Sequence, residues 1–281
     1  MSEYFRIPTT GAFGDPIDEN PSGIMMEAGY RSVGLDWRYQ LFRVPADQLE
    51  NGLKGIKAMG FAGLNLTIPH KIAAIPYMKG LSKSAELIGA INVVLVKEDG
   101  LYGENTDGKG FVSGMKANGI SLEGKTIVIL GSGGAARAIG VECALAGAGK
   151  ITIVCRTLSK GEELAKLISE KTDCSAEALL WTPAVVLPEC EILINATNIG
   201  LYPDTNVPDI CYDCIKKDMI VQDIIPNPAD TPFLKKVRGL GARTLDGQSM
   251  LVHQGALGVE LWTGKKPDID AMKKALEECF Q

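Results

Sequence analysis

Residues 125–147 read KTIVILGSGGAARAIGVECALAG, and this stretch decides the fold of the chain. A β-branched run comes first, a glycine-rich turn follows, and small and apolar residues then recur at helical spacing, which predicts strand, turn and helix. Gly131, Gly133 and Ala136 form the pattern G-x-G-x-x-A where the predicted strand passes into the helix. Gly131 permits a tight turn, Gly133 lets a pyrophosphate approach the backbone, and Ala136 allows close packing of helix and sheet. With the unpaired N–H groups of the helix N-terminus, the stretch predicts a dinucleotide site; a turn needed only for packing is the alternative.

A second predicted strand and helix follow directly. Residues 150–155 (KITIVC) form another β-branched run, and residues 158–171 (LSKGEELAKLISEK) carry an apolar stripe at helical spacing. Ser159 and Glu162 resemble a capping box at the start of this helix. Two such units predict a parallel sheet with right-handed crossovers, and residues 191–196 and 218–224 are further candidates for buried strands. This part of the chain therefore predicts a doubly wound dinucleotide-binding domain of the Rossmann type.

The residues after the second predicted strand distinguish NAD from NADP. An acidic side chain at this place binds the ribose hydroxyls of NAD and repels a 2′-phosphate. Residues 155–160 read CRTLSK and contain no carboxylate. Arg156 and Lys160 are able to pair with a phosphate, and Thr157 offers a hydroxyl. NADP is therefore the predicted cofactor, and a solvated basic surface is the alternative.

The part of the chain before the glycine turn has shorter elements of its own. The segments that predict them are YFRIPTTG at 4–11, a helix at 22–28, a strand at 37–44, a helix at 46–59 and GFAGLNLTI at 60–68. Residues 247–262 and 268–279 predict two helices with no strand between them. We therefore expect a substrate-binding and catalytic domain at 1–110 plus 246–281, and a dinucleotide-binding domain at 111–245.

Composition narrows the partners and the compartment. The chain has 281 residues and a net charge of -5, which disfavours nucleic acid as a partner because phosphate backbones require a basic patch. No segment approaches the roughly 20 apolar residues that span a bilayer. An odd count of 7 cysteines suits free thiols in a reducing compartment, so a cytoplasmic location is expected. With 2 histidines, and with Cys211 and Cys214 lacking a second pair, no metal site is expected.

A bound nicotinamide implies hydride transfer, which requires a proton donor or acceptor beside the reacting carbon. We expect the first domain to supply it. Three segments there place polar side chains at the ends of apolar runs, namely NLTIPHK at 65–71, GAIN at 89–92 and GENTDG at 103–108. A cleft between two domains collects such side chains.

These motifs resemble those of the shikimate and quinate dehydrogenase family, and the resemblance runs nearly end to end. The three segments match N-x-T-x-P-x-K, G-A-x-N and G-x-N-T-D-G. Further matches are Arg156-Thr157, Asn195-Ala196-Thr197, Asp246-Gly247, Met250-Leu251-Val252 and Gln254. The resemblance implies an N-terminal α/β substrate domain, a Rossmann NADP domain, and C-terminal helices that return to the first domain. It also implies NADP-dependent interconversion of a ring alcohol and its ketone, with shikimate and 3-dehydroshikimate or a close relative such as quinate, in aromatic amino acid biosynthesis.

The family's residue roles transfer position by position. Lys71 and Asp107 resemble the acid/base pair, in which the lysine ammonium protonates the forming alkoxide and the free amine takes the proton in the reverse direction. An ordinary surface ion pair is the alternative. The resemblance implies substrate contacts from Asn20, Ser22, Thr67, Asn92 and Gln254. It implies cofactor contacts from Gly131, Gly133, Gly134, Ala135, Arg156, Thr157, Lys160, Thr197, Gly247 and Met250.

The two histidines have no assigned role. We expect His70 to be exposed, because the family fills this position freely. His253 is next to Gln254 on a predicted helix, so a contact with substrate or cofactor is one possibility there and a packing role is the other.

The departures from the family concern the site for the substrate carboxylate. Asn20, Pro21, Ser22 and Gly23 stand where the family has Ser-x-Ser-Pro. Val93 replaces a threonine, and Pro226 stands in place of the aromatic hydroxyl of a D-x-x-Y loop. Each hydrogen bond to a charged group contributes about 1.5 to 3 kcal/mol, so losing one or two weakens shikimate binding roughly tenfold or more unless Asn20 compensates.

Three functions therefore remain open from the sequence. The first is a shikimate dehydrogenase-like enzyme that acts on an alicyclic small molecule. The second is a related enzyme that acts on a different cyclic polyol or hydroxy acid. The third is a non-catalytic NADP-binding sensor, which the retention of Lys71 and Asp107 disfavours. A monomer or a homodimer is expected.

Overall fold

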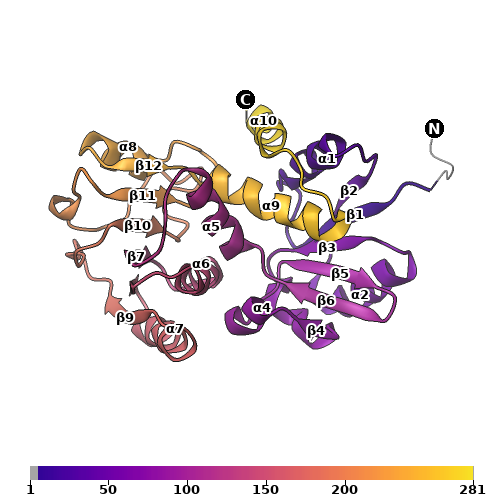
Figure 1. Ribbon diagram of the computed structural model, residues 1–281, viewed down its shortest axis with the longest axis horizontal. Coiled ribbons are helices and arrows are strands. Elements are labelled where there is room, and N and C mark those ends of the chain that lie inside the picture. The colour runs from indigo at the N-terminus through magenta and orange to yellow at the C-terminus, as the bar shows by residue number, and fades with distance from the viewer. Residues whose placement is uncertain (1–5, 281) are drawn as a thin grey trace. The chain divides into compact units, whose positions relative to one another are not determined.

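The stretch at residues 125–147 forms a strand, a turn and a helix, as its pattern predicts. The computed structural model, which describes residues 6–280, places this unit in the middle of a six-stranded parallel sheet with the order β12-β11-β10-β7-β8-β9 (Figure 1). The strands are β7 (Thr126–Leu130), β8 (Lys150–Cys155), β9 (Ser175–Leu180), β10 (Ile192–Asn195), β11 (Ile220–Asp223) and β12 (Arg243–Leu245). The helices are α5 (Asp107–Ala117), α6 (Gly134–Leu145), α7 (Leu158–Lys171) and α8 (Pro232–Gly239), with a 3-10 turn at Tyr212–Cys214. The predicted doubly wound sheet is confirmed.

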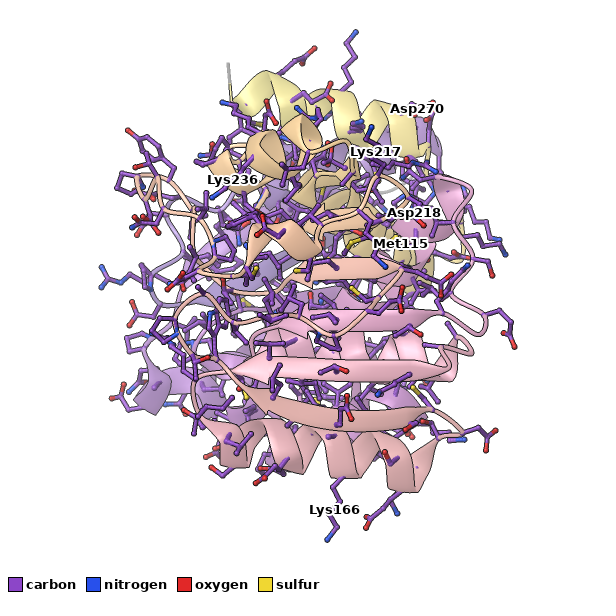
Figure 2. All side chains as sticks on the ribbon, turned by 90° about the vertical axis from the view of Figure 1, so that its left-hand side faces the viewer. Met115, Lys166, Lys217, Asp218, Lys236 and Asp270 are labelled. Carbon is purple, nitrogen blue, oxygen red and sulfur yellow. The ribbon has the colours of Figure 1, made fainter. Side chains whose placement is uncertain are left out.

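Helix α7 shows how the apolar stripe and the start of a helix are separate signals. Its stripe is confirmed, because Leu164 and Ile168 are buried while Lys166 points outward into solvent (Figure 2). The predicted capping box at Ser159 is wrong. The helix begins at Leu158 with Thr157 as N-cap, and no side chain caps it. Ser159 therefore already has helical backbone, which turns its hydroxyl away from the first free N–H groups.

Two strands of this sheet escaped sequence analysis, and both lie at its edges. The side chains of β9 alternate between exposed and half-buried, and β12 spans only three residues. Edge strands bury one face at most, so they lack the continuous apolar run that marks a central parallel strand.

The other sheet combines parallel and antiparallel pairs in the order β2-β1-β3-β5-β6-β4. Its strands are β1 (Thr9–Gly14), β2 (Arg38–Arg43), β3 (Gly63–Leu66), β4 (Gly80–Leu81), β5 (Val93–Lys97) and β6 (Gly100–Glu104). The associated helices are α1 (Ser22–Ser32), α2 (Leu49–Ala58), α3 (His70–Ala73) and α4 (Lys83–Ile88), with 3-10 turns at Ala46–Gln48 and Ile75–Tyr77. The predicted elements within 6–68 are present, while Tyr4 and Phe5 of the first segment lie outside the described residues. Phe13, Leu53 and Leu64 belong to the hydrophobic cluster between α2 and the sheet.

The two sheets belong to two compact units of the chain. The chain passes from the first unit to the second between Thr106 and Asp107, and returns to the first between Leu251 and Val252, inside helix α9 (Gly247–Thr263). The functional boundaries predicted at residues 110 and 246 stay a prediction. Within residues 6–280, no helix combines the length and hydropathy that crossing a bilayer requires.

The C-terminal helices complete the first unit, as predicted. Helix α10 (Ile269–Cys279) packs against α1 (Figure 1). The three helices α1, α9 and α10 meet at Gly29, where a Cβ would lie 3.0 Å from Sδ of Met272 and 3.3 Å from Cγ2 of Val259. This close packing holds the part of α9 that carries Gln254 to the first unit.

Candidate functional site

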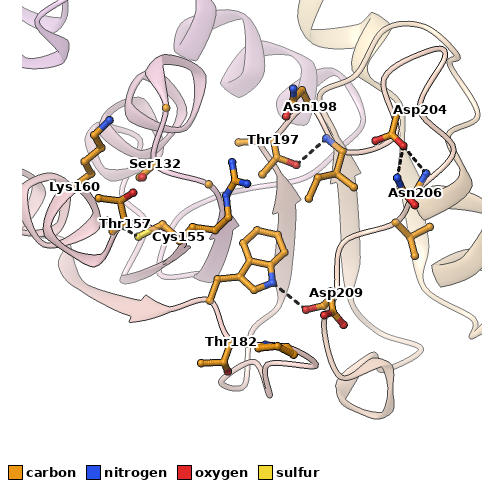
Figure 3. Close-up of a pocket in the computed structure, with 18 residues that line it drawn as sticks. Ser132, Cys155, Thr157, Lys160, Thr182, Thr197, Asn198, Asp204, Asn206 and Asp209 are labelled. Carbon is orange, nitrogen blue, oxygen red and sulfur yellow. Dashed lines mark hydrogen bonds between the residues drawn. The ribbon is translucent and has the colours of Figure 1, made fainter.

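A cavity of about 780 Å³ opens in the second unit (Figure 3). It follows the carboxyl ends of β7, β8, β9 and β10, which is where open α/β sheets bind their ligands. Six of the predicted cofactor residues line it, namely Gly131, Gly133, Arg156, Thr157, Lys160 and Thr197. The structure therefore brings the glycine turn and the basic segment after β8 to one place.

The glycine turn leaves its outer face open for a phosphate. Gly131 has φ +111, and a Cβ there would lie 3.0 Å from the carbonyl oxygen of Ala196, so only glycine fits. A Cβ on Gly133 or Gly134 would instead meet nothing within 4 Å. Gly133 is the N-cap of α6, and it has no side chain that could accept a hydrogen bond from the first N–H groups of this helix. These N–H groups fit a pyrophosphate.

The basic segment fits the additional phosphate of NADP. Arg156 and Thr157 follow β8 and Lys160 lies in the first turn of α7; all three are exposed and line the cavity. No acidic residue lies among residues 155–160 to repel a 2′-phosphate. The cavity therefore suits NADP by its charge as well as by its open glycine turn.

Four predicted cofactor residues do not line this cavity. Gly134 and Ala135 lie in the first turn of α6, beside it. Gly247 and Met250 lie in the first turn of α9. A Cβ on Gly247 would collide with the backbone of Ile224 and Ile225, so this glycine is required by close packing of α9 on the loop after β11.

In the first unit, a buried hydrogen-bond cluster is centred on Asn92. Its Nδ2 donates to Oγ1 of Thr106 at 3.0 Å and to Oε1 of Gln254 at 3.3 Å. Its Oδ1 accepts from the backbone N–H of Thr106 at 2.7 Å. All three residues are at most 9% exposed. Two of the predicted substrate residues, Asn92 and Gln254, are thus neighbours in the structure although far apart in the sequence.

Two further hydrogen bonds connect this cluster to Asn65 and, through Asn65, to Tyr39. Nδ2 of Asn65 donates to the carbonyl oxygen of Asn92 at 3.0 Å. The buried hydroxyl of Tyr39 donates to Oδ1 of Asn65 at 2.7 Å. Tyr39, Asn65 and Thr106 were not among the site residues predicted from the sequence. The motifs at 65–71 and 103–108 hold a signal for Asn65 and Thr106, whereas nothing in the sequence marks Tyr39.

Thr67 lies directly after β3, and Lys71 lies in the first turn of α3. The backbone N–H of Ile91 donates to the carbonyl oxygen of Lys71 at 2.8 Å, which places Lys71 beside the residue before Asn92. The N–H of Thr67 donates to the carbonyl oxygen of Phe13 at 2.9 Å. Asp107, the predicted partner of Lys71, is the first residue of α5 in the second unit.

The expectation that His70 is exposed is wrong. Its side chain is fully buried, and Nε2 lies 2.8 Å from the carbonyl oxygen of Val44. The imidazole thus ties the start of α3 to the end of β2, which is a structural role. His253 lies half-buried on α9, and burial lowers the pKa of its imidazole because the charged form is desolvated.

The segment that departs from the family begins α1. The Oδ1 of Asn20 accepts a hydrogen bond from the backbone N–H of Ser22 at 2.9 Å, which leaves the amide Nδ2 as the polar group that Asn20 offers to a ligand. Ser22 is buried at the start of the helix. A Cβ on Gly23 would lie 3.7 Å from Cδ1 of Tyr39, so Gly23 is a neighbour of the residue that donates to Asn65.

Asp223 is a buried carboxylate that joins the loops after β10 and β11. It accepts hydrogen bonds from Nδ2 of Asn195 at 3.0 Å and from Oγ1 of Thr231 at 2.8 Å. The Oδ1 of Asn195 in turn accepts from Oγ1 of Thr197, at the cavity wall, at 2.6 Å. Burial raises the pKa of the Asp223 carboxyl to about 6 because desolvation outweighs these hydrogen bonds.

The described residues contain neither a disulfide nor a cluster of metal-ligating side chains. All seven cysteines are unpaired. Within residues 6–280, no three His, Cys, Asp or Glu side chains come together as a metal site would require.

The cavity at the glycine turn and the hydrogen-bond cluster around Asn92 define a class of protein. It is an α/β dehydrogenase with a dinucleotide site and a separate polar substrate site. Models of the shikimate dehydrogenase substrate binding domain and of the shikimate 5'-dehydrogenase C-terminal domain match residues 12–94 and 247–277. The shikimate dehydrogenase (NADP(+)) of Methanococcus maripaludis is 40% identical over 267 residues, which are 95% of each chain. The chain belongs to the shikimate dehydrogenase family, so the predicted resemblance is confirmed.

Solved structures agree with this assignment. A shikimate dehydrogenase in complex with NADP+ is 37% identical, with a TM-score of 0.91 over 98% of this chain and 96% of that one. A ligand-free 5-ketofructose reductase of Gluconobacter sp. strain CHM43 is 47% identical, with a TM-score of 0.95 over 99% of this chain and 100% of that one. Both are similar to this chain over both units.

The raised pKa of Asp223 predicts a pH dependence of stability. The carboxyl has a pKa of about 6 when folded, against 3.8 as its ordinary value, so its protonated form favours the folded state. The stability that it contributes is present below pH 4 and is lost as the pH rises to about 6. The free energy of unfolding of the wild type minus that of Asp223→Asn should fall by about 2 to 3 kcal/mol between pH 4 and pH 7. Urea unfolding at several pH values measures this difference, and a flat difference would contradict the burial argument.

Proposed function

We propose that the chain catalyses the NADP-dependent interconversion of a ring alcohol and its ketone. The observation that supports this most is the cavity at the glycine turn, which joins open N–H groups at Gly133 to the cations Arg156 and Lys160. When bound, NADP supplies or accepts the hydride. In this proposal, residues 111–245 hold the cofactor, and residues 1–110 with 246–281 hold the substrate.

The substrate-side residues divide the remaining work. Lys71 donates a proton to the forming alkoxide during ketone reduction, and takes the hydroxyl proton in alcohol oxidation as the free amine. Asp107 is its partner in the acid/base pair, as the family's motif implies. Asn92 and Gln254 orient ring hydroxyls, because their amides are already fixed to each other and to Thr106. Thr67 contacts the substrate from the same segment as Lys71.

Two groups of residues contact the cofactor in this proposal, one at the cavity and one at the start of α9. In this proposal the phosphates and the ribose are held by six residues that line the cavity, namely Gly131, Gly133, Arg156, Thr157, Lys160 and Thr197, together with Gly134 and Ala135 in the first turn of α6. Gly247 and Met250, at the start of α9, face the nicotinamide end in this proposal. The shikimate and 3-dehydroshikimate pair is the first substrate candidate, because the named relatives are shikimate dehydrogenases.

The activity and the role of Lys71 are tested together by following NADPH absorbance. The purified protein should oxidise shikimate, quinate or an uncharged cyclic polyol with NADP. Lys71→Ala should lower kcat by about 100- to 10,000-fold, the usual contribution of a general acid or base. The matched control is Lys83→Ala, at an exposed lysine of the same unit, which should keep wild-type rates. Binding of NADP without turnover of any of these alcohols would instead favour the sensor.

The choice of cofactor is tested by reversing one charge. Arg156→Asp removes a cation and places a carboxylate where a 2′-phosphate would lie. The ratio of kcat/KM for NADP to that for NAD should fall at least tenfold, because a charge-assisted hydrogen bond is worth about 1.5 to 3 kcal/mol. Lys166→Asp, on the outer face of α7 (Figure 2), is the control and should leave the ratio unchanged. An equal ratio in all three proteins contradicts the assignment of this segment.

An uncharged polyhydroxy ketone is the second substrate candidate. The family's carboxylate donors are partly replaced, since Asn20 binds the N–H of Ser22 and Pro226 carries no hydroxyl. The chain is also 47% identical to a protein named 5-ketofructose reductase. A substrate without a carboxylate makes no use of the missing donors, so their loss costs it nothing.

The two substrate candidates are separated by restoring the missing donors. Asn20→Ser combined with Pro226→Tyr should raise kcat/KM for shikimate about tenfold or more if one hydrogen bond to the carboxylate is restored and about 100-fold or more if both are, because each contributes about 1.5 to 3 kcal/mol. The same change should leave kcat/KM for 5-ketofructose unchanged or lower. If shikimate turnover does not respond, the carboxylate is held elsewhere or is not part of the natural substrate.

The cell compartment and the assembly belong to the same proposal. Seven unpaired cysteines are expected of a protein in a reducing compartment, so we place the reaction in the cytoplasm. A monomer or homodimer is proposed, acting on a small molecule.

A further inference from the structure

Trp181 lies directly after β9, on the wall of the NADP cavity. The backbone N–H of Trp181 donates to the carbonyl oxygen of Cys155 at 2.9 Å. This bond places Trp181 next to the residue that precedes Arg156. Sequence analysis did not predict β9, and therefore gave no role to the tryptophan at its end.

The indole is fixed at several points. Its Nε1–H donates to the carbonyl oxygen of Asp209 at 2.9 Å (Figure 3), and part of the ring packs against the hydrophobic cluster that includes Val154, Val185 and Ile210. Oδ1 of Asp209 also accepts from the N–H of Ala184 at 3.1 Å. The side chain is nevertheless only half-buried. The fold thus holds a large aromatic ring rigidly while leaving part of it open to the cavity.

A second segment that lines the cavity is also held by hydrogen bonds. Val207 and Asn206 line it, and Asp204 holds this segment by accepting from the N–H groups of Gly200 and Asn206, each at 3.0 Å. These bonds also keep the pKa of the Asp204 carboxyl below its usual range. An apolar side chain and an indole therefore border the same space beside Arg156.

We propose that Trp181 is the platform on which the adenine ring of NADP stacks, an inference that rests on the proposed cofactor site. In a parallel sheet of this kind the adenosine half lies toward the strand that follows the glycine unit, which here means β8 and its neighbour β9. The only polar donor of an indole is its N–H, and that group is already bonded to Asp209. The contact left to Trp181 is therefore its π-face, which suits a flat base.

This contact sets cofactor affinity without taking part in hydride transfer. Arg156 and Lys160 supply the charge for the phosphate, and Trp181 supplies the contact for the base. Stacking of a base on an aromatic side chain is worth a factor of about 10 or more in affinity. Loss of the ring should thus raise the Kd for every ligand that contains adenosine, and leave the reacting end of the site unchanged.

The test uses ligands that separate the two halves of the cofactor. Calorimetric titration with adenosine 2′,5′-bisphosphate and with NADP should show a Kd about tenfold higher for Trp181→Ala than for the wild type, and a nearly unchanged Kd for Trp181→Phe. At saturating NADP, kcat and the KM for the alcohol should stay at wild-type values in both variants. Trp37→Phe, an aromatic replacement in the first unit, is the matched control and should bind both ligands normally.

Tryptophan fluorescence gives a readout that does not depend on the folding of the alanine variant. Adenosine 2′,5′-bisphosphate should quench the emission of the wild type and of Trp37→Phe, and this quenching should be absent in Trp181→Phe. Equal quenching in all three proteins overturns the proposal. So does a Kd for adenosine 2′,5′-bisphosphate that is the same in Trp181→Ala as in the wild type. If the protein binds the bisphosphate through Trp181 but turns over no alcohol, the proposed function fails while this inference stands. If Trp181→Ala shows normal turnover with an unchanged KM for NADP, this inference fails while the proposed function stands.

Discussion

The buried amide of Asn92 is the constraint on which the substrate site depends. A buried amide without partners costs several kcal/mol, so each of its polar atoms must be matched. The matching groups come from Thr106, shortly after β6, and from Gln254 on α9. Gln254 lies 162 residues after Asn92 in the sequence. The neighbouring Ile91 is bonded to the carbonyl oxygen of Lys71. The amide of Asn92 and the backbone N–H of Ile91 therefore join, within the first unit, the segments that carry Lys71, Asn92 and Gln254.

The second unit solves a different problem, the binding of a large and highly charged cofactor. Gly131 is forced by its positive φ and by the carbonyl oxygen of Ala196, and this tight turn leaves the N-terminus of α6 open. Asp223, Asn195 and Thr197 form a hydrogen-bonded chain that holds the opposite loop at the cavity wall. The cations of the site stay exposed, where their charge costs little and is available to a phosphate.

Local patterns predicted the parts of the fold that depend on local periodicity. Strand β7 follows from a short continuous β-branched run, and helices α6 and α7 follow from apolar residues at helical spacing. The edge strands β9 and β12 were missed because one side of an edge strand carries no apolar signal. The start of α7 was misplaced because Ser159 has the composition of a cap without the backbone of one. His70 was wrongly expected to be exposed, since its burial depends on the carbonyl oxygen of Val44, which is distant in the sequence.

In the candidate site, too, local features could be predicted from the sequence and contacts between distant segments could not. The glycine turn and the basic segment after β8 are each legible from a few consecutive residues, and their meeting in one cavity follows from the parallel sheet. The hydrogen bonds that link Asn92 with Gln254, and Tyr39 with Asn65, join distant segments and leave no pattern in the sequence. The family motifs predicted substrate contacts for Asn92 and Gln254, whereas the hydrogen bond of Tyr39 and the place of Trp181 at the cavity are visible only in the structure.

The most direct test of the account follows the hydride itself. The protein is incubated with NADPH deuterated at the reactive face of the nicotinamide, in separate reactions with 3-dehydroshikimate and with 5-ketofructose. We predict that at least one product alcohol carries a single deuterium on its carbinol carbon and that unlabelled NADH supplies hydrogen far more slowly. We also predict that Lys71→Ala still binds NADPH but slows the transfer by about 100- to 10,000-fold. Tight binding of NADPH with no deuterium in either product would contradict the account.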